Sequence, residues 1–226
     1  MTELAELIVG SAPEPWARIG LRPHNGAVRI GAVALRLDLA AQGIGGWGLA
    51  GWPDPAGVPS DLDGLPTYAA PAATDPPEPN ELGASRLELV SIATSSIQRT
   101  AEAIAQATGE PLKGLRESDA FAVGYIRLGE VLAEIVRSGS AEPGRARFGG
   151  LIIVVEDLAE VSARLGPDVI SEVRIAVQYG RYIATFRPGV GLGLPVAAMT
   201  PPPPAPPTSE QLAQWHERRL AVRGAL

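Results

Sequence analysis

The sequence predicts an α+β protein built from tandem β-α-β-β-β modules. Between residues 85 and 200, segments with the alternating pattern of strands are interleaved with segments that have helical periodicity. The same order occurs twice at an offset of 61 residues, and a proline-rich stretch lies on either side of this region. Repetition at a fixed period is typical of a fold assembled from copies of one unit. Pairs related by the offset are Val90 with Leu151, Ile97 with Leu158 and Glu134 with Pro195.

Each module of the pair begins with an apolar strand followed by a capped helix. Ser95 or Ser96 can cap the first helix, and Asp157 can cap the second. Gly109 and Gly166 end the two helices. The predicted elements are a strand at 87–93, a helix at 97–108 and strands at 113–117, 121–128 and 131–136, then a strand at 151–155, a helix at 158–165 and strands at 172–178, 182–187 and 194–199.

The N-terminal part is predicted to be a third, degenerate module over residues 1–52. Its residues 28–37 parallel residues 126–135 of the first complete module. A strand at 5–9 and a short helix at 13–18, with proline near its first turn, precede them. Trp16 and Trp47 are large apolar groups in a segment too short to stand alone. We expect them to pack against the paired modules or, in a homodimer, against a second chain.

Prolines set the remaining boundaries. Eight of the 22 prolines lie within residues 53–84, which are expected to form an irregular connection. The paired modules then occupy 85–200. Six more prolines open the segment 201–226 and predict a stiff polyproline spacer before a terminal helix.

The terminal helix carries clear start signals. Thr208 stands three residues before Gln211, which is the spacing of a capping box. Leu212, Trp215 and Arg219 recur along one face of the helix. Two interpretations stay open: the helix binds a partner, or Trp215 packs back onto the protein's own surface.

Composition excludes several function classes. The chain has 19 basic and 25 acidic residues, a net charge of -6, no cysteine and two histidines. An acidic chain lacks the positive surface that nucleic-acid binding needs. Zinc fingers, iron–sulfur clusters and thiolate nucleophiles require cysteine. The start is acidic and no long apolar run follows it, so we expect no membrane span and a cytoplasmic protein.

The repeated modules resemble the vicinal oxygen chelate superfamily, which includes glyoxalases, bleomycin-resistance proteins and extradiol dioxygenases. The resemblance lies in residues 87–97, 127–136, 176–185 and 193–196. It implies that two modules curl their strands into one cup-shaped mixed sheet with the site inside. The superfamily includes isomerases, lyases and ligand-sequestering proteins, so the resemblance implies a small-molecule ligand without naming the reaction.

The superfamily's metal normally takes one ligand from the first strand and a glutamate from the last strand of each module. By resemblance, the corresponding positions here are Leu89, Gly150, Glu134 and Pro195. Only Glu134 carries a donor group, and one carboxylate does not hold a divalent ion against water. We therefore expect neither a metal nor another cofactor.

Glu134 is the candidate catalytic residue. It lies in a strand whose two faces are both mostly apolar, so it should be at least partly buried. Burial raises the pKa of a lone carboxyl group and makes it a plausible general base near neutral pH. The alternative is a structural ion pair with an arginine such as Arg127 or Arg174.

Three further side chains are candidate substrate contacts. Tyr125 and Arg127 share one face of their strand, where they could orient an anionic or oxygen-rich ligand. Tyr182 begins a strand after a glycine-containing hairpin and could act similarly. A tyrosine on a sheet more often belongs to the core or the rim, and this interpretation stays open for each of them.

Three functional hypotheses follow. The first is a metal-independent isomerase or lyase that acts on a small oxygen-rich metabolite with Glu134 as the base. The second is a binding protein that sequesters a small molecule without chemistry. The third is a scaffold whose cup is filled by side chains and whose terminal helix makes the interactions. A cavity large enough for a ligand separates the first two from the third, and a polar cluster around Glu134 separates the first from the second.

Overall fold

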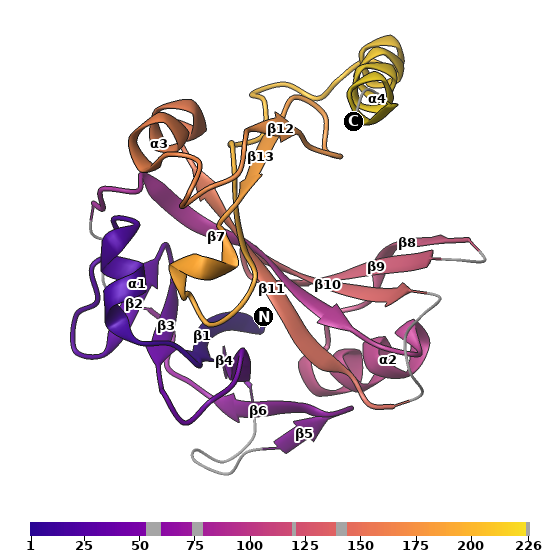
Figure 1. Ribbon diagram of the computed structural model, residues 1–226. Helices are drawn as coiled ribbons and strands as arrows, with labels where there is room; N and C mark the ends of the chain where they lie inside the picture. Colours follow the sequence, from indigo (N-terminus) through magenta and orange to yellow (C-terminus); the bar gives the residue numbers. More distant parts are fainter. Residues whose placement is uncertain (53–59, 74–78, 119–120, 139–143, 225–226) are drawn as a thin grey trace.

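The computed structural model describes residues 1–52, 60–73, 79–118, 121–138 and 144–224, and it consists of two mixed β-sheets around one apolar core (Figure 1). The N-terminal strands form a six-stranded sheet, and the remaining strands form an eight-stranded sheet. We call these the first sheet and the second sheet.

The second sheet has the predicted pair of β-α-β-β-β modules. Its strand order is β12-β13-β14-β11-β7-β10-β9-β8. The first strand of each module runs parallel to the last, and the two first strands meet antiparallel in the middle of the sheet. The elements are β7 (Ala84–Ala93), α2 (Ile97–Thr108), β8 (Lys113–Glu117), β9 (Phe121–Leu128), β10 (Val131–Ser138), β11 (Arg147–Val155), α3 (Leu158–Leu165), β12 (Arg174–Ile175), β13 (Tyr182–Thr185), a single 3-10 turn (Pro188–Val190) and β14 (Val196–Met199).

The predicted helix boundaries of the second sheet are confirmed. The Ser96 hydroxyl accepts a hydrogen bond from the Arg99 amide at 3.3 Å, and Gly109 ends α2 in the left-handed conformation, with φ of 75°. The Asp157 carboxylate caps α3 in the same way, 2.8 Å from the Glu160 amide. Local capping signals therefore place both helices.

The first sheet is a smaller version of the same arrangement. Its order, β2-β3-β1-β4-β6-β5, again has a parallel pair on either side of an antiparallel centre. It thus contains two truncated modules, and the second of them has no helix among its described residues. The elements are β1 (Glu3–Val9), α1 (Pro13–Arg18), β2 (Ala27–Ile30), β3 (Val33–Leu37), β4 (Ile44–Ala50), β5 (Ser60–Leu62) and β6 (Leu65–Ala69).

This arrangement corrects two predicted boundaries. Residues 1–52 are not one degenerate module, because β4 starts a second one. Residues 53–84 are not only a connection, because β5 and β6 lie within them. These strands are short, and the buried positions of β6 alternate with an exposed proline: Leu65 and Thr67 are fully buried on either side of Pro66. A proline and a buried threonine hide the strand from a reading of apolar alternation. The strand predicted at 172–178 is likewise shortened, to the two residues of β12.

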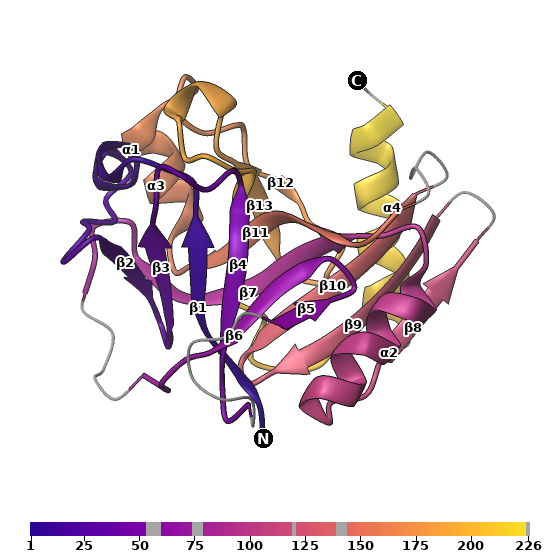
Figure 2. The ribbon, with the colours of Figure 1, turned by 90° about the horizontal axis from the view of Figure 1, so that it is seen from below.

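The two sheets pack through their apolar faces. Trp47 of β4 is fully buried, and its ring meets Phe148 of β11 edge to face, with 5.3 Å between centroids. Helices α2 and α3 lie on the same side of the second sheet as the first sheet (Figure 1). The opposite face of the second sheet carries neither helix and is turned away from the first sheet (Figure 2). We call it the concave face, and we call the hollow on it, which Glu134, Ile152, Ile183 and Met199 help to line, the cup.

The terminal helix α4 (Ser209–Gly224) docks at the edge of this cup. The capping box is present: the Thr208 amide donates to Gln211 at 2.8 Å, and the Gln211 amide donates to the Thr208 hydroxyl at 3.2 Å. Trp215 is buried against the segment between β12 and β13, where its Nε1 donates to the Ala176 carbonyl at 3.1 Å. Of the two interpretations of Trp215, packing on the protein's own surface is confirmed. No helix in the described ranges is long and apolar enough to cross a membrane.

Candidate functional site

Strand register brings Glu134 to the centre of the concave face. Glu134 of β10 pairs with Ser91 of β7 on one side and with Tyr125 of β9 on the other. Laterally paired residues point to the same side of a sheet. The side chains of these three residues therefore share the concave face, at the wall opposite β13 and β14.

A cavity of about 390 Å³ lies beside Glu134. This volume is within the range of small-molecule sites. Its floor is apolar, with Ile152, Ile183 and Met199 from three neighbouring strands. Residues 174–178 line a second side and include Arg174 and Gln178, while Thr185 and Arg219 complete the lining.

The environment of Glu134 favours its protonated form. Burial raises the pKa of this carboxyl group, and hydrogen bonding from the Tyr125 hydroxyl partly offsets the effect. In turn, burial and the adjacent Glu134 charge raise the pKa of Tyr125. Tyr125 therefore stays protonated and serves as a donor to Glu134.

The ion pair considered for Glu134 does not form. Across the described ranges, no ion pair joins Glu134 to Arg127 or Arg174. Arg127 is exposed and pairs across the sheet with Leu132, two positions along β10 from Glu134. Arg174 lies in the cavity wall. Within the described ranges the carboxyl group thus has a hydrogen-bond donor, Tyr125, and no cation beside it.

Tyr182 is separated from this cavity. Its ring meets Trp215 of α4 edge to face, with 5.7 Å between centroids, and 43% of the residue remains exposed. Tyr179 contacts the same indole at the same distance. Tyr182 therefore belongs to the surface on which α4 docks. Tyr125 and Glu134 lie together, and Arg127 lies at the rim of the cup.

Arg219 is the cavity residue that sequence reasoning missed. It follows Trp215 by one helical turn, so docking of the indole carries the arginine to the cup. The available signal was an arginine in the otherwise apolar stripe of the terminal helix. Whether this arginine reaches the cavity depends on where the helix docks, and the stripe alone does not show the docking position.

The residues around Glu134 do not fit the metal of the superfamily. Leu89 pairs across the strands with Leu132, which stands two residues before Glu134, and Gly150 lies beside Pro195. None of these four has a side-chain donor for a metal. The described residues contain no group of three His, Cys, Asp or Glu side chains that could hold an ion.

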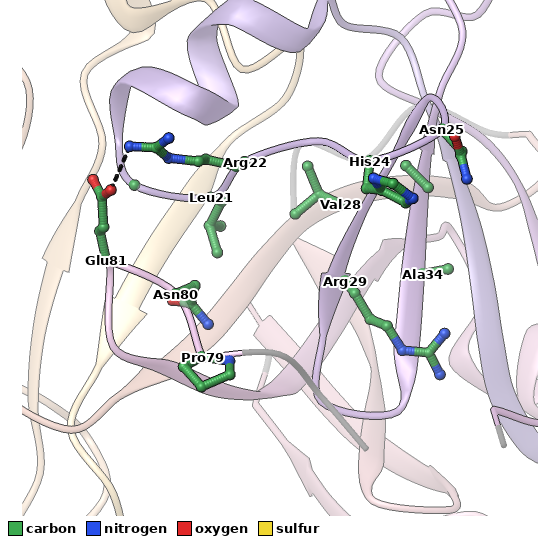
Figure 3. A pocket seen from close by; sticks show the side chains of 12 residues that line it. Leu21, Arg22, His24, Asn25, Val28, Arg29, Ala34, Pro79, Asn80 and Glu81 are labelled. Atoms are coloured by element: carbon green, nitrogen blue, oxygen red, sulfur yellow. Dashed lines mark hydrogen bonds and ion pairs between the residues drawn. The ribbon is translucent and has the colours of Figure 1, made fainter. Parts of the chain in front are cut away.

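A second pocket, of about 430 Å³, lies on the first sheet (Figure 3). Arg22, His24, Arg29, Asn80 and Glu81 are among its lining residues. Its carboxylate, Glu81, is held by Arg22 at 2.6 Å, the contact drawn as a dashed line. The carboxylate of this pocket therefore has a cationic partner, unlike Glu134 in the cup.

No family model matches the sequence, and no curated protein matches it. Solved structures do resemble it. A variant of 4-hydroxymandelate synthase from Streptomyces coelicolor aligns with 96% of this chain and 98% of its own, at a TM-score of 0.56 and 14% identity. This match spans both sheets.

Two shorter structures cover about half of the chain. Methylmalonyl-CoA epimerase from Mycobacterium tuberculosis aligns with 56% of this chain and 94% of its own, at a TM-score of 0.46 and 14% identity. A hypothetical protein from Bacillus halodurans aligns with 54% and 98%, at 0.44 and 16%. The paired modules, their register and the full-length match agree: the chain has the glyoxalase-like fold of paired β-α-β-β-β modules that the sequence predicts.

Proposed function

We propose that the cup of the second sheet binds a small oxygen-rich molecule and that Glu134 acts on it as a general base without a metal. The observation that carries this proposal is a carboxyl group with no cationic partner among the described residues, in a wall of a small-molecule-sized cavity. Structural carboxylates at such depth are normally paired. An unpaired carboxylate with a raised pKa is suited to accepting a proton near neutral pH.

The reaction class is an isomerisation or a lyase-type elimination, because both begin with proton removal from carbon. The Glu134 carboxylate takes the proton from a carbon next to a substrate carbonyl, and the electron pair left behind is delocalised onto that carbonyl oxygen. In an isomerase the protonated Glu134 returns the proton, on the same face, to another carbon of the conjugated system. In a lyase the electron pair instead expels a leaving group. Tyr125 holds the Glu134 carboxylate in place throughout.

The alternative is a protein that sequesters its ligand without chemistry. The apolar floor of the cavity favours this candidate, because Ile152, Ile183 and Met199 supply contact area but no second acid or base. Tyr125 and Glu134 would then serve only as hydrogen-bonding partners. Cytoplasmic location and homodimer formation stay predictions in either case.

Proton exchange with solvent tests the base directly, before any product is known. The full chain is incubated in D₂O with a panel of small oxo acids, and exchange at the carbon next to the carbonyl is followed by NMR. Glu134→Gln should reduce catalysed exchange by roughly 10²–10⁴-fold, because an amide cannot accept the proton.

Glu6→Gln is the matched control, since Glu6 is also a partly buried sheet glutamate beside a tyrosine. Its exchange rate should equal that of the unmodified chain. Saturable binding of a panel member without exchange would instead favour sequestration. Exchange that survives Glu134→Gln would overturn the assignment of the base.

A further inference from the structure

The charged lining of the cup is unbalanced. It contains two guanidinium groups, from Arg174 and Arg219, against the one carboxyl group of Glu134. The whole chain carries a net charge of -6, so this local positive excess runs against the overall charge.

Neither arginine is committed to a protein carboxylate. Over the described ranges, no ion pair or hydrogen bond involves the side chain of Arg174 or Arg219. The Nε of Arg219 is shielded from water and has no acceptor there. A buried donor without an acceptor is costly, which makes an acceptor supplied by a ligand favourable.

The two arginines reach the cup from different elements. Arg174 belongs to β12, and Arg219 lies on α4, which is held at the β12–β13 hairpin by Trp215. Figure 1 shows α4 beyond this hairpin, on the concave side of the second sheet and across from β8–β10. The helix thus completes one wall of the cavity with a fixed positive charge.

We propose that Arg219, with Arg174, forms an oxyanion subsite that makes the cup selective for small organic anions bearing a carboxylate or a phosphate. This inference rests on the proposed function, since it names the substrate class of the same site. A guanidinium group binds both kinds of oxyanion through paired N–H donors. The apolar floor then receives the body of the ligand, between the anion at one wall and Glu134 at the other.

Hexanoate and hexanamide test this subsite, because they share an alkyl chain and differ in charge. The full chain should bind hexanoate at least about tenfold more tightly than hexanamide, as followed by ligand-detected NMR, since a charge-assisted hydrogen bond contributes that much. Arg219→Gln and Arg174→Gln should each remove most of the preference. Inorganic phosphate is the third probe. If it displaces hexanoate, the subsite accepts phosphate groups as well as carboxylates. If it does not, the subsite is selective for carboxylates.

Arg218→Gln is the matched control. Arg218 is exposed on the same helix and lines a separate groove with Tyr179 and Gln214. It should leave hexanoate binding unchanged. Equal binding of hexanoate and hexanamide, no binding of hexanoate at all, or equal losses in Arg218→Gln and Arg219→Gln would each overturn the proposal. A thermal melt of every variant establishes that α4 remains folded.

The experiments distinguish failure of the Arg219 subsite from failure of Glu134 as the base. Glu134→Gln should retain or strengthen hexanoate binding, because it removes the one carboxylate of the cavity. If hexanoate binding depends on Arg219 but no proton exchange depends on Glu134, the base is wrong and the subsite stands. If exchange depends on Glu134 but is indifferent to Arg219 and to charge, the subsite is wrong and the base stands.

Discussion

The two sheets each carry a glutamate and a tyrosine on the face turned away from the core, and they use them differently. On the first sheet, Glu6 accepts a hydrogen bond from the Tyr68 hydroxyl at 2.6 Å and forms an ion pair with Arg36 at 3.0 Å. On the second sheet, Glu134 has Tyr125 beside it but no arginine partner among the described residues. The same fold unit therefore pairs one carboxylate with a cation and leaves the other without one.

The two sheets also differ in the free space on their outward faces. A Cβ atom added to Gly48 of β4 would lie only 2.7 Å from the Tyr68 ring, so this ring lies directly over the strand. Burial, followed by the hydrogen bond and charge of Glu6, raises the pKa of Tyr68 well above its usual range. The tyrosine thus fills the face of the first sheet, whereas Ile152 and Met199 leave the cup of the second sheet open.

The largest effect is expected where the two sheets meet. Trp47→Ala removes a fully buried indole that contacts Phe148 and donates a 2.6 Å hydrogen bond to the Thr67 hydroxyl. The free energy of unfolding should fall by about 3–5 kcal/mol, because a large cavity is left behind and the Thr67 hydroxyl loses a donor while keeping its bond to the Leu65 carbonyl. Urea denaturation measures the loss. Leu39→Ala, at an exposed site, is the control, and equal small losses in both would show that the sheets are independent.

The next effect concerns a carboxylate of the second sheet that is paired. Burial alone would raise the pKa of Glu88, but the hydrogen bond and charge of Arg181, followed by those of Arg86, lower it overall. Arg181 is 4% exposed and lies 2.5 Å from Glu88. Glu88→Gln should cost about 3 kcal/mol at neutral pH, since it leaves the Arg181 charge buried without its partner.

The pH dependence of this contribution has a definite sign. Glu88 is more acidic in the folded than in the unfolded chain, so its stabilisation is present above the ordinary glutamate pKa and is lost as the pH falls through the lowered pKa. Melting temperatures of Glu88→Gln and the unmodified chain should therefore converge on acidification. A gap that stays constant down to the lowest pH would contradict the ion-pair role.

Glu6→Gln should have a smaller effect. The Arg36 side chain is 51% exposed, and half-exposed ion pairs contribute little. We expect a loss of at most about 1 kcal/mol and no change in ligand binding at the cup. A thermal melt beside a hexanoate titration checks both expectations. Altered hexanoate affinity would show that the two outward faces are coupled, against the division described above.

Much of the fold follows from local patterns, whereas the site depends on contacts between distant segments. The 61-residue repeat placed both complete modules, and strand alternation brought Glu134 to the face that it shares with Tyr125. Tyr182 was expected at the ligand because nothing in its strand indicates that Trp215 covers it. Arg219 was missed for the same reason, since its place follows from the docking of α4.

The smallest expected effect distinguishes Glu134 most sharply from the paired carboxylates. Because burial raises its pKa, Glu134 is less acidic in the folded than in the unfolded chain. Its ionisation therefore reduces stability as the pH rises from the ordinary glutamate value through the raised value, which is the reverse of the behaviour of Glu88.

Glu134→Gln should then be as stable as the unmodified chain at pH values below the ordinary glutamate pKa and slightly more stable above the raised one. The melting temperature should accordingly rise a little at high pH and stay unchanged at low pH. The Gln side chain still accepts the hydrogen bond from Tyr125, so no partner is left unsatisfied. A melting temperature that falls by many degrees at every pH would instead mean that Glu134 holds the fold together, and the contrast with Glu6 would disappear.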